Sequence, residues 1–360
     1  MTNNHRFCVI MCGGIGSRFW PYSRTDMPKQ FIDFLGTGRS LLQMSYDRVL
    51  GIVPKENVVI LTNAQYADKV KEQLPDLADS QILLEPARRN TAPCIAWAAY
   101  HIAAIDPEAS IIVTPSDHLI TREREFESSV LEGFDFVESH DALLTLGIKP
   151  VRPETGYGYI QIGEEVEGNI HKVKTFTEKP NLELAQTFLR TGEFFWNSGI
   201  FLWTAKSIIK ALATSSPDLN AIFEAGQETF NTPDEITFIR QAYPGCMSIS
   251  IDYAVMEKAD NVYVETVNFG WNDLGTWSAL YDMSPKNRDG NVTQRCQVLA
   301  YNSHGNIFAV KGDKLIVADG LTDYIVADAG DVLLICPKSQ EQRIKQMVND
   351  VKMTFGDKFL

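Results

Sequence analysis

Residues 7–31 read FCVIMCGGIGSRFWPYSRTDMPKQF, and the start of this stretch decides the fold. The apolar run Phe7–Met11 predicts a short buried strand that ends at Gly13-Gly14. Similar apolar strands are predicted at 57–62, 81–84, 110–114 and 142–148, with helices at 41–50, 64–74 and 92–105. Because apolar strands that alternate with helices indicate a sheet covered on both faces, we expect an α/β fold with a Rossmann-like, mixed and mainly parallel sheet.

The pattern changes twice beyond this sheet. After Gly147, glycines punctuate short strands such as Ile170–Thr177, which we interpret as a lobe inserted to complete the site. From about Asn291, short β-rich runs between Gly and Asp turns predict a small C-terminal β-rich domain, coiled as a β-helix. The runs are 307–310, 315–317, 324–327 and 332–335, followed by an amphipathic helix at about 340–351. We therefore expect two domains, residues 1–285 and 286–360.

Composition excludes several classes of protein. The 360 residues are 44% hydrophobic and 22% charged, which is ordinary for a globular chain, and a net charge of -13 argues against nucleic-acid binding. The six cysteines form no C-x-x-C pair and are expected to be buried, reduced thiols. Since the apolar stretch Phe7–Cys12 is too short for a signal peptide or a membrane span, we expect a cytoplasmic protein.

The loop after the first strand is rich in glycine. Glycines allow backbone N–H groups to approach a phosphate without an intervening Cβ. A dinucleotide-binding G-x-G-x-x-G is ruled out because Phe19 stands where the third glycine would be, and no P-loop string occurs. A purely structural turn is the alternative. As a phosphate-binding loop, it would use Gly13, Gly14, Gly16 and Ser17.

Two cations follow this loop, Arg18 and Lys29. An arginine offers a planar fork for phosphate oxygens and a lysine offers a point charge. Their presence beyond a glycine-rich strand end favours binding of a triphosphate over a structural turn.

Two aspartates are candidate metal ligands. Asp117 directly follows the strand at 110–114, and ligands of open α/β sheets lie at such carboxyl ends. Asp273 lies in the WNDLGTW string, after the strand-like Val262–Val267. Magnesium is usually held by one or two carboxylates together with substrate phosphates. A helix cap is the alternative role for an aspartate after a strand. We regard His118 as a supporting residue rather than a ligand.

The segment from Gly13 to Phe31 resembles the signature of sugar-nucleotide pyrophosphorylases. Its form, with Phe19-Trp20-Pro21 and Pro28-Lys29-Gln30-Phe31, is similar to that of mannose-1-phosphate guanylyltransferases. The resemblance covers roughly residues 7–280. It implies a GT-A-like nucleotidyltransferase fold, a Mg²⁺ cofactor held by Asp117 and Asp273, and a homodimer. It also implies that the catalytic residues are Arg18, Lys29, Asp117 and Asp273.

Four further strings match family motifs in the expected order: ETGYGYI at 154–160, FTEKP at 176–180, FWNSGIF at 195–201 and SIDY at 250–253. Taken alone, they could be an edge-strand bend, a surface ion pair or a buried amide. The resemblance implies that they bind the sugar phosphate, with Lys179 on the phosphate and the sugar contacted by Gly158, Glu178, Asn197 and Asp252.

The string EPARRNTAP at 85–93 follows the third strand and opens a helix. Guanine requires donors at O6 and N7 and an acceptor at N1–H and N2–H₂. Asn90 and nearby backbone groups offer both, although Asn90 or Thr91 could simply cap the helix. The string resembles the guanylyltransferase version, which favours GTP and implies nucleotide binding by Glu85, Asn90, Thr91 and Ala92.

The resemblance implies conversion of GTP and mannose 1-phosphate into GDP-mannose and pyrophosphate, by in-line attack of the sugar phosphate on the α-phosphorus. Since the second pKa of a phosphomonoester is about 6, the attacking group is ionised at neutral pH and we expect no general base. Another nucleotide or hexose 1-phosphate stays open, as does a non-catalytic regulatory homologue. Some relatives carry a phosphomannose isomerase domain after the transferase; because this chain ends at Leu360, we expect one activity.

Overall fold

The computed structural model of the protein describes residues 4–14, 16–310, 312 and 314–360. The chain folds into two compact units, each assembled from separate segments. Unit 1 comprises Met1–Gly13, Ser45–Ser116 and Ile120–Trp271, and unit 2 comprises Gly14–Met44, Asp117–Leu119 and Asn272–Leu360. Helix α1 (Leu41–Val49) carries the chain from unit 2 back into unit 1.

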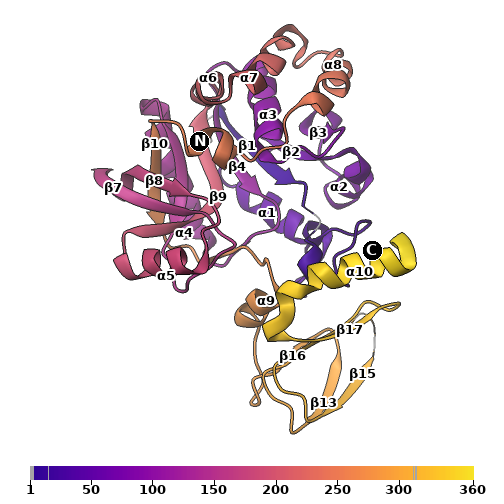
Figure 1. Ribbon diagram of the computed structural model, residues 1–360. Helices are drawn as coiled ribbons and strands as arrows, with labels where there is room; N and C mark the ends of the chain where they lie inside the picture. Colours follow the sequence, from indigo (N-terminus) through magenta and orange to yellow (C-terminus); the bar gives the residue numbers. More distant parts are fainter. Residues whose placement is uncertain (1–3, 15, 311, 313) are drawn as a thin grey trace. The chain divides into compact units, whose positions relative to one another are not determined.

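Unit 1 is built on a nine-stranded mixed sheet in the order β3-β2-β1-β4-β9-β6-β10-β8-β7 (Figure 1). The strands β1 to β4 are mutually parallel where they pair, and β6 pairs parallel with β10. Strand bounds are β1 Arg6–Cys12, β2 Val58–Asn63, β3 Ile82–Glu85, β4 Ser110–Pro115, β6 Leu143–Ile148, β7 Tyr159–Glu167, β8 Ile170–Thr177, β9 Phe194–Thr204 and β10 Val262–Val267. This arrangement confirms the predicted fold class.

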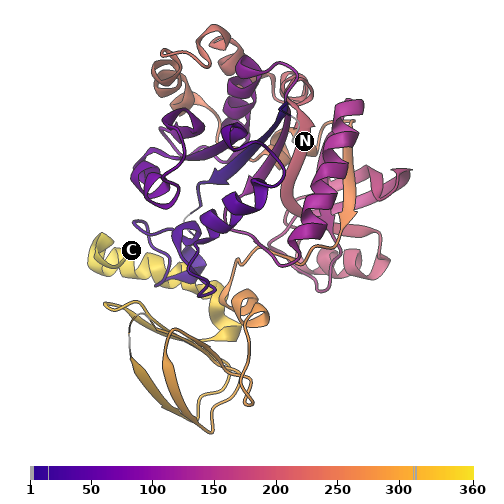
Figure 2. The same ribbon diagram turned by 180° about the vertical axis from the view of Figure 1, so that it is seen from behind.

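Helices cover both faces of this sheet. In β9, Phe201 and Trp203 belong to the apolar cluster that includes α3 and α6, whereas Leu202 faces Gly133 of α4. Since successive strand residues point to opposite faces, α4 lies on the other side of the sheet from α3 and α6, and it stands in front of the sheet in Figure 2. The helices are α2 Ala67–Gln73, α3 Thr91–Ile105, α4 Glu123–Ser139, α5 Leu182–Thr191, α6 Ala205–Ser215, α7 Pro217–Glu224 and α8 Glu235–Ala242.

The carboxyl ends of the parallel strands lie at one edge of the sheet. Met11 of β1 is in register with Pro115 of β4, and the Ser116 amide donates to the Met11 carbonyl at 3.0 Å. On the other side, Asn63 of β2 is in register with Glu85 of β3. This edge is where ligands of open α/β sheets bind.

Strand β9 was not predicted, although it lies at the centre of the sheet. Its sequence FFWNSGIFLWT is interrupted by Asn197, Ser198 and Gly199, which break the apolar run. The pairing of β9 with β6 shifts register between Thr145 and Gly147, close to this interruption. A polar interruption in a central strand therefore coincides with a local irregularity of the sheet.

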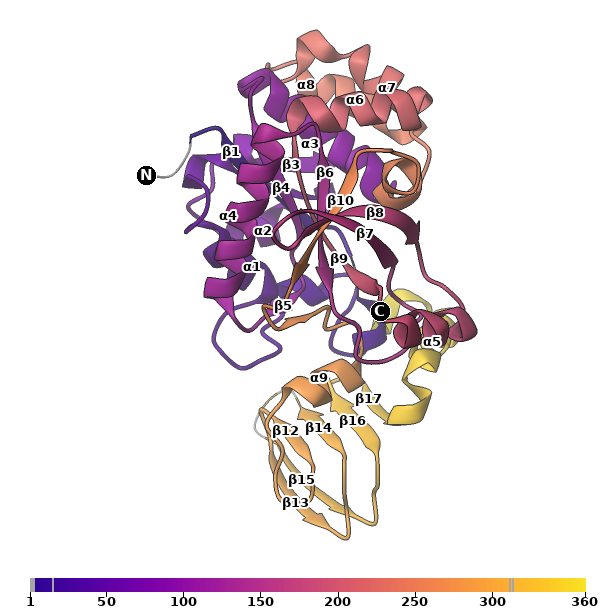
Figure 3. The ribbon, with the colours of Figure 1, turned by 90° about the vertical axis from the view of Figure 1, so that its left-hand side faces the viewer.

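Unit 2 contains the β-rich C-terminal part (Figure 3). Gln297 pairs parallel with Leu315, and Ile307 pairs parallel with Ile325, so the chain returns in register after 18 residues in both cases. The pair β12–β14 returns after 15 residues, and such repeated returns of parallel strands are the geometry of a coiled β-helix. The strands are β12 Val292–Gln294, β13 Gln297–Tyr301, β14 Ile307–Val310, β15 Leu315–Asp319, β16 Tyr324–Asp328 and β17 Leu333–Pro337.

The signature segment and the residues just after it share a core with these strands. Phe19 and Trp20 of the segment, and Phe34 after it, belong to one apolar cluster with Ile307 and Ile325 of the β-rich part. Helix α9 (Trp277–Met283) contributes its buried tryptophan and leucine to the same cluster. The terminal helix α10 (Ile344–Phe355) begins later than predicted, because a 3₁₀ segment, η9 (Lys338–Arg343), precedes it.

All six cysteines are free, as predicted; five of them are buried, whereas Cys296, also predicted to be buried, is only half-buried. Within the described part of the chain, no helix combines the length and apolar character needed to cross a membrane.

Candidate active site

Unit 2 brings Lys29, Asp117 and Asp273 together. The Lys29 ammonium donates to Asp117 Oδ2 at 3.0 Å and to the main-chain carbonyl of Asp273 at 2.6 Å. The Lys29 side chain is only 3% exposed, whereas that of Asp117 is 30% exposed. This lysine lies within the short 3₁₀ segment η2 (Lys29–Phe31), which fixes its direction. A buried cation thus links two aspartates that are far apart in the sequence.

The charge of Lys29 keeps Asp117 ionised. Burial of the Asp117 carboxyl opposes ionisation, but the charges of Lys29 and His118 outweigh it, so the pKa of Asp117 lies below its ordinary value. His118 Nε2 lies 3.8 Å from Asp117 Oδ1. Asp273 uses Oδ1 to accept a hydrogen bond of 2.9 Å from the Gly275 amide. Among the residues that the structure describes, no group of three or more His, Cys, Asp or Glu is arranged to hold a metal ion.

The glycine-rich loop packs on the stem of Lys29. Gly16 has a φ of +69°, and a Cβ at this position would lie 2.6 Å from the Cβ of Lys29. Ser23 donates its hydroxyl to the Gly16 carbonyl. Glycine is therefore required at residue 16 by backbone conformation and by space. Gly14 has no neighbour within 4 Å of such a Cβ, and Ile15 lies outside the described residues.

Arg18 is oriented by a residue that the sequence did not single out. It lies in η1 (Ser17–Phe19), and its Nε donates to Gln342 Oε1 at 3.0 Å. In the described part of unit 2, the terminal nitrogens of Arg18 have no further hydrogen-bond partner. The guanidinium is thus held through its Nε, which leaves its two terminal nitrogens to bind an anion.

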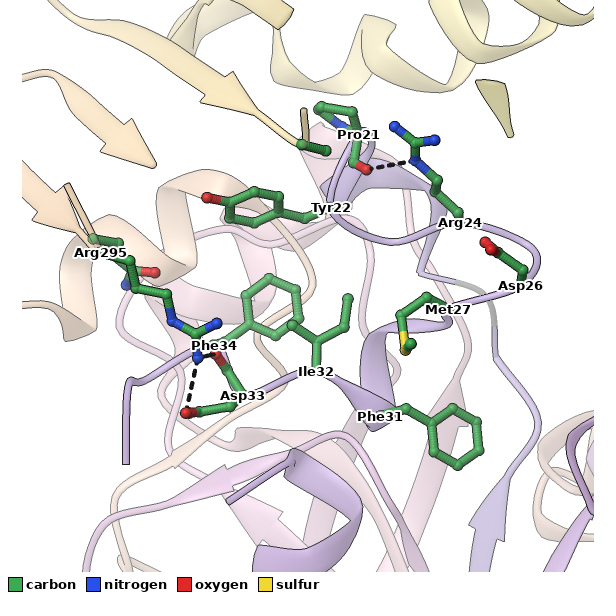
Figure 4. A pocket seen from close by; sticks show the side chains of 12 residues that line it. Pro21, Tyr22, Arg24, Asp26, Met27, Phe31, Ile32, Asp33, Phe34 and Arg295 are labelled. Atoms are coloured by element: carbon green, nitrogen blue, oxygen red, sulfur yellow. Dashed lines mark hydrogen bonds and ion pairs between the residues drawn. The ribbon is translucent and has the colours of Figure 1, made fainter. Parts of the chain in front are cut away.

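A cavity of about 360 Å³ adjoins the rest of the signature segment (Figure 4). Arg24 donates to the Pro21 carbonyl at 3.1 Å and pairs with Asp331, and Arg295 pairs with Asp33 at 2.8 Å. Lys29 is not among its described lining residues. The two ion pairs connect the middle of the segment, and Asp33 just after it, to the β-rich part of unit 2, and Lys29 does not line the cavity in the described residues.

Unit 1 brings the five predicted sugar-phosphate residues together. A Cβ on Gly158 would lie 2.6 Å from Glu178 Oε2 and 3.3 Å from the Cβ of Asn197, so a larger residue there would displace the Glu178 carboxylate. Asn197 donates its side-chain amide to Asp252 Oδ1 at 2.9 Å, and its main-chain N–H to the Gly158 carbonyl at 2.9 Å. The ammonium of Lys179 pairs with Glu178. Carboxylates, an amide and an ammonium therefore line one small region.

Two carboxyls of this region influence each other. Burial, together with the nearby charge of Glu178, raises the pKa of Asp252 to about 6. The Glu178 side chain is 7% exposed, while that of Lys179 is 61% exposed. A sugar, which carries hydroxyl donors, would find acceptors on the buried side, and a phosphate would find a cation on the exposed side.

Glu85, at the end of β3, is held by Tyr243. The Tyr243 hydroxyl donates to Glu85 Oε1, and both side chains are buried. Burial raises the pKa of Glu85 to about 7, although the hydrogen bond from Tyr243 and the charge of Arg88 act to lower it. A Cβ on Gly13 would lie 3.8 Å from Glu85 Oε2, which places the residue that follows β1 beside this carboxyl. Tyr243 was not predicted from the sequence.

Asn90 and Thr91 have the structural roles that were considered for them. Asn90 is the N-cap of α3, and its Oδ1 accepts from the Thr91 amide at 2.9 Å. The Thr91 hydroxyl accepts from the Ile251 amide at 2.8 Å, and the Ala92 amide donates to the Ile249 carbonyl at 3.0 Å. These bonds attach the start of α3 to the segment that leads into Asp252. Within unit 1, the predicted base side and sugar side are therefore directly connected.

Comparisons with known proteins match two consecutive parts of the chain to known families. Residues 7–290 match the family model described as nucleotidyl transferase, and residues 297–351 match that of a MannoseP isomerase/GMP-like beta-helix domain. The chain therefore belongs to the nucleotidyl transferase family of enzymes. This confirms the class of enzyme and the β-helix character expected from the sequence.

Curated relatives indicate which nucleotidyl transferases this chain resembles. A mannose-1-phosphate guanylyltransferase of Salmonella montevideo is 38% identical, with 96% of this chain and 74% of that protein aligned. One from Escherichia coli K12 is 36% identical, with 98% of this chain and 74% of that protein aligned. These relatives confirm the resemblance to mannose-1-phosphate guanylyltransferases that the signature segment indicated.

Two solved structures are similar over most of their length. A mannose-1-phosphate geranyltransferase from Thermus thermophilus has a TM-score of 0.87 and 27% identity, covering 97% of this chain and 99% of that one. A mannose-6-phosphate isomerase from Helicobacter pylori has a TM-score of 0.60 and 26% identity, covering 74% of this chain and 99% of that one.

Proposed function

We propose that the chain transfers a guanylyl group from GTP to mannose 1-phosphate, forming GDP-mannose and pyrophosphate. The observation that carries this proposal is the Lys29 ammonium held between Asp117 Oδ2 and the Asp273 carbonyl, at 3.0 and 2.6 Å, beneath the glycine-rich loop. The names of the curated relatives support the choice of base and sugar. We also propose that the protein is a cytoplasmic homodimer and that its domain boundary follows residue 285.

Asp117 and Asp273 are proposed to hold Mg²⁺. The ionised carboxyl of Asp117 is 30% exposed, and Lys29 joins it to the main-chain carbonyl of Asp273. Carboxylates are ligands that suit magnesium, which completes its shell with phosphates and water. When bound, the ion would neutralise charge on the phosphates of the nucleotide.

The protein's own cations perform the remaining electrostatic work. The phosphate of mannose 1-phosphate attacks the α-phosphorus, the bond to the β-phosphate oxygen breaks, and pyrophosphate leaves with its electron pair. The attacking oxygen is already ionised at neutral pH, so no residue has to accept a proton. Arg18 and Lys29 are proposed to bind the triphosphate, and Lys179 the sugar phosphate. Their role is to bring like-charged groups together and to align them.

Glu85 is proposed to read the base. An ionised carboxylate can accept from the N1–H and N2–H₂ donors of guanine, whereas adenine offers an acceptor at N1. The Tyr243 hydroxyl holds one carboxylate oxygen in place. On the sugar side, Glu178, Asn197 and Asp252 are proposed to bind the hydroxyls of mannose.

A pyrophosphate-release assay tests the proposal. Purified protein is incubated with each of four ribonucleoside triphosphates and a panel of hexose 1-phosphates, and the nucleotide sugar is identified by mass. We expect GTP and mannose 1-phosphate to give the highest kcat/KM. A clear preference for another pair would replace the proposed substrates by the same reaction on that pair. No turnover with any pair, by a folded protein, would indicate a non-catalytic homologue.

A further inference from the structure

A second cavity, of about 580 Å³, lies in unit 1 between the edge strand β3 and the helix α8. Its apolar walls include Leu84, Trp97, Ile236 and Ile239. None of the residues proposed to bind substrate is among its described lining residues. Its size falls within the range of about 300–1,000 Å³ that is typical of small-molecule sites.

The described lining of this cavity carries two basic and two acidic side chains, and both acidic ones are paired, which leaves a cation as its unpaired charge. Glu235 is fully engaged, because its carboxylate accepts from Trp97 Nε1 at 2.7 Å and the Asn231 amide at 2.8 Å, and contacts His101 Nδ1 at 2.9 Å. Lys71 pairs with Asp79 at 2.7 Å. What remains, in the described part of the cavity, is the guanidinium of Arg240 and Nε2 of His101, neither of which has a hydrogen-bond or ion-pair partner.

We propose that this cavity is an effector site for a small aromatic organic anion. The apolar walls suit a flat hydrocarbon body, and Trp97 and Ile236 lie on opposite elements, α3 and α8. Arg240 supplies the cation that would bind one anionic head. A cation would meet two acidic side chains in the described lining, Glu235 and Asp79, and both are already paired.

The walls of the cavity lead directly to the base side of the proposed active site. Helix α8 continues into η7 (Tyr243–Gly245), and β3 ends at Glu85. Tyr243 donates to Glu85, and Arg89 Nε donates to the Pro244 carbonyl at 3.1 Å. The two walls are therefore the two segments that these bonds join. A ligand that orders both walls lowers the entropic cost of fixing Glu85, and it therefore raises the affinity for GTP. By linkage, GTP raises the affinity for that ligand by the same factor. Only this coupling rests on the proposed function.

Binding to the site is tested with 8-anilinonaphthalene-1-sulfonate, an aromatic body with one sulfonate, by fluorescence titration of the intact chain. We expect one probe per chain. Ile236→Asp, at an exposed position of α8, should lower the affinity for the probe by at least about tenfold. Arg240→Ala should lower it by about three- to tenfold. The matched control is Leu184→Asp, an exposed leucine of α5 that does not line the cavity, which should leave affinity unchanged. Equal loss in Ile236→Asp and Leu184→Asp, or no binding at all, would overturn the site.

Coupling is tested by repeating the titration with GTP at saturation. We expect the dissociation constant of the probe to fall by about three- to tenfold, and the effect to shrink in Tyr243→Phe. Displacement of the probe by GTP would assign it to the nucleotide site and overturn the proposal. An unchanged constant, with GTP shown to bind, would overturn the coupling. If GTP itself does not bind, the proposed function fails, while the titration without nucleotide still decides whether the cavity is a site.

Discussion

Gly16 and Lys29 are in van der Waals contact: a Cβ added to the glycine would lie 2.6 Å from the Cβ of the lysine. The glycine-rich loop and Lys29 are therefore one packed element. Any change in the loop at this point displaces the ammonium that bridges Asp117 and Asp273.

Gly16→Ala is expected to reduce kcat/KM for GTP by about tenfold or more, because the new methyl group pushes against the lysine stem and the backbone has positive φ. Gly36 provides a matched control, since its φ is also +69° but no atom lies within 4 Å of the added Cβ. Gly36→Ala should lose a similar amount of stability from the backbone alone and keep its activity. Measuring kcat/KM and the midpoint of thermal unfolding for both variants separates the two effects; equal activity losses would contradict the prediction.

Asp273→Ala is expected to lower turnover at least about a hundredfold, equivalent to about 2.7 kcal/mol, if the carboxylate helps to hold magnesium. The main-chain carbonyl that binds Lys29 stays in the variant, so the loss reports on the carboxylate. Circular dichroism confirms folding, and a magnesium titration should show a raised requirement for the ion. Near-normal turnover by folded protein would refute the assignment.

The pH dependence of GTP use should follow Glu85. Burial raises its pKa to about 7, and only the ionised carboxylate can accept from both N1–H and N2–H₂ of guanine without presenting a proton of its own, so GTP affinity is expected to fall as the pH drops through about 7. The hydrogen bond from Tyr243 lowers this pKa, so Tyr243→Phe should move the midpoint of the profile to higher pH. The measurement is kcat/KM for GTP at a series of pH values on both sides of neutrality. A uniform loss with an unmoved midpoint would mean that Tyr243 only supports the fold.

Gln342→Ala is expected to raise KM for GTP about fivefold, because Arg18 loses the hydrogen bond that orients it, worth about 1 kcal/mol. Gln346→Ala is the control, since this glutamine lies on the same helical stretch and bonds to Asp350 instead. Steady-state kinetics of both variants give the comparison. If Gln346→Ala raises KM as much as Gln342→Ala does, the effect comes from the helix and not from Arg18.

The fold could be predicted where apolar runs were unbroken. Strand β10, for example, has the predicted bounds Val262–Val267. The central strand β9 was missed because Asn197 and its neighbours interrupt the run, and the side chain of Asn197 bonds to Asp252 rather than packing in the apolar core. Conflicts between local pattern and tertiary role are expected at functional positions.

The site could be predicted where chemistry is concentrated in short strings. The residues predicted to bind the sugar phosphate lie together in unit 1, with Gly158, Glu178 and Asn197 in contact. Tyr243 and Gln342 could not be found in this way. Their partners, Glu85 and Arg18, lie 158 and 324 residues away in the chain, and neither Tyr243 nor Gln342 belongs to a motif of its own. Residues that position others leave little local trace in a sequence.

The shared core of the signature segment and the β-helix determines how this protein can be recombined. Phe19, Trp20 and Phe34 pack with Ile307 and Ile325, so the loop and the β-rich strands have to match each other in shape. A chimaera that takes only its C-terminal domain from a relative would combine core residues from two proteins whose shapes do not match. Exchanging residues 14–44, 117–119 and 272–360 as a set keeps this core intact, because Leu119 also belongs to it, and the crossover points therefore lie at the ends of these three ranges.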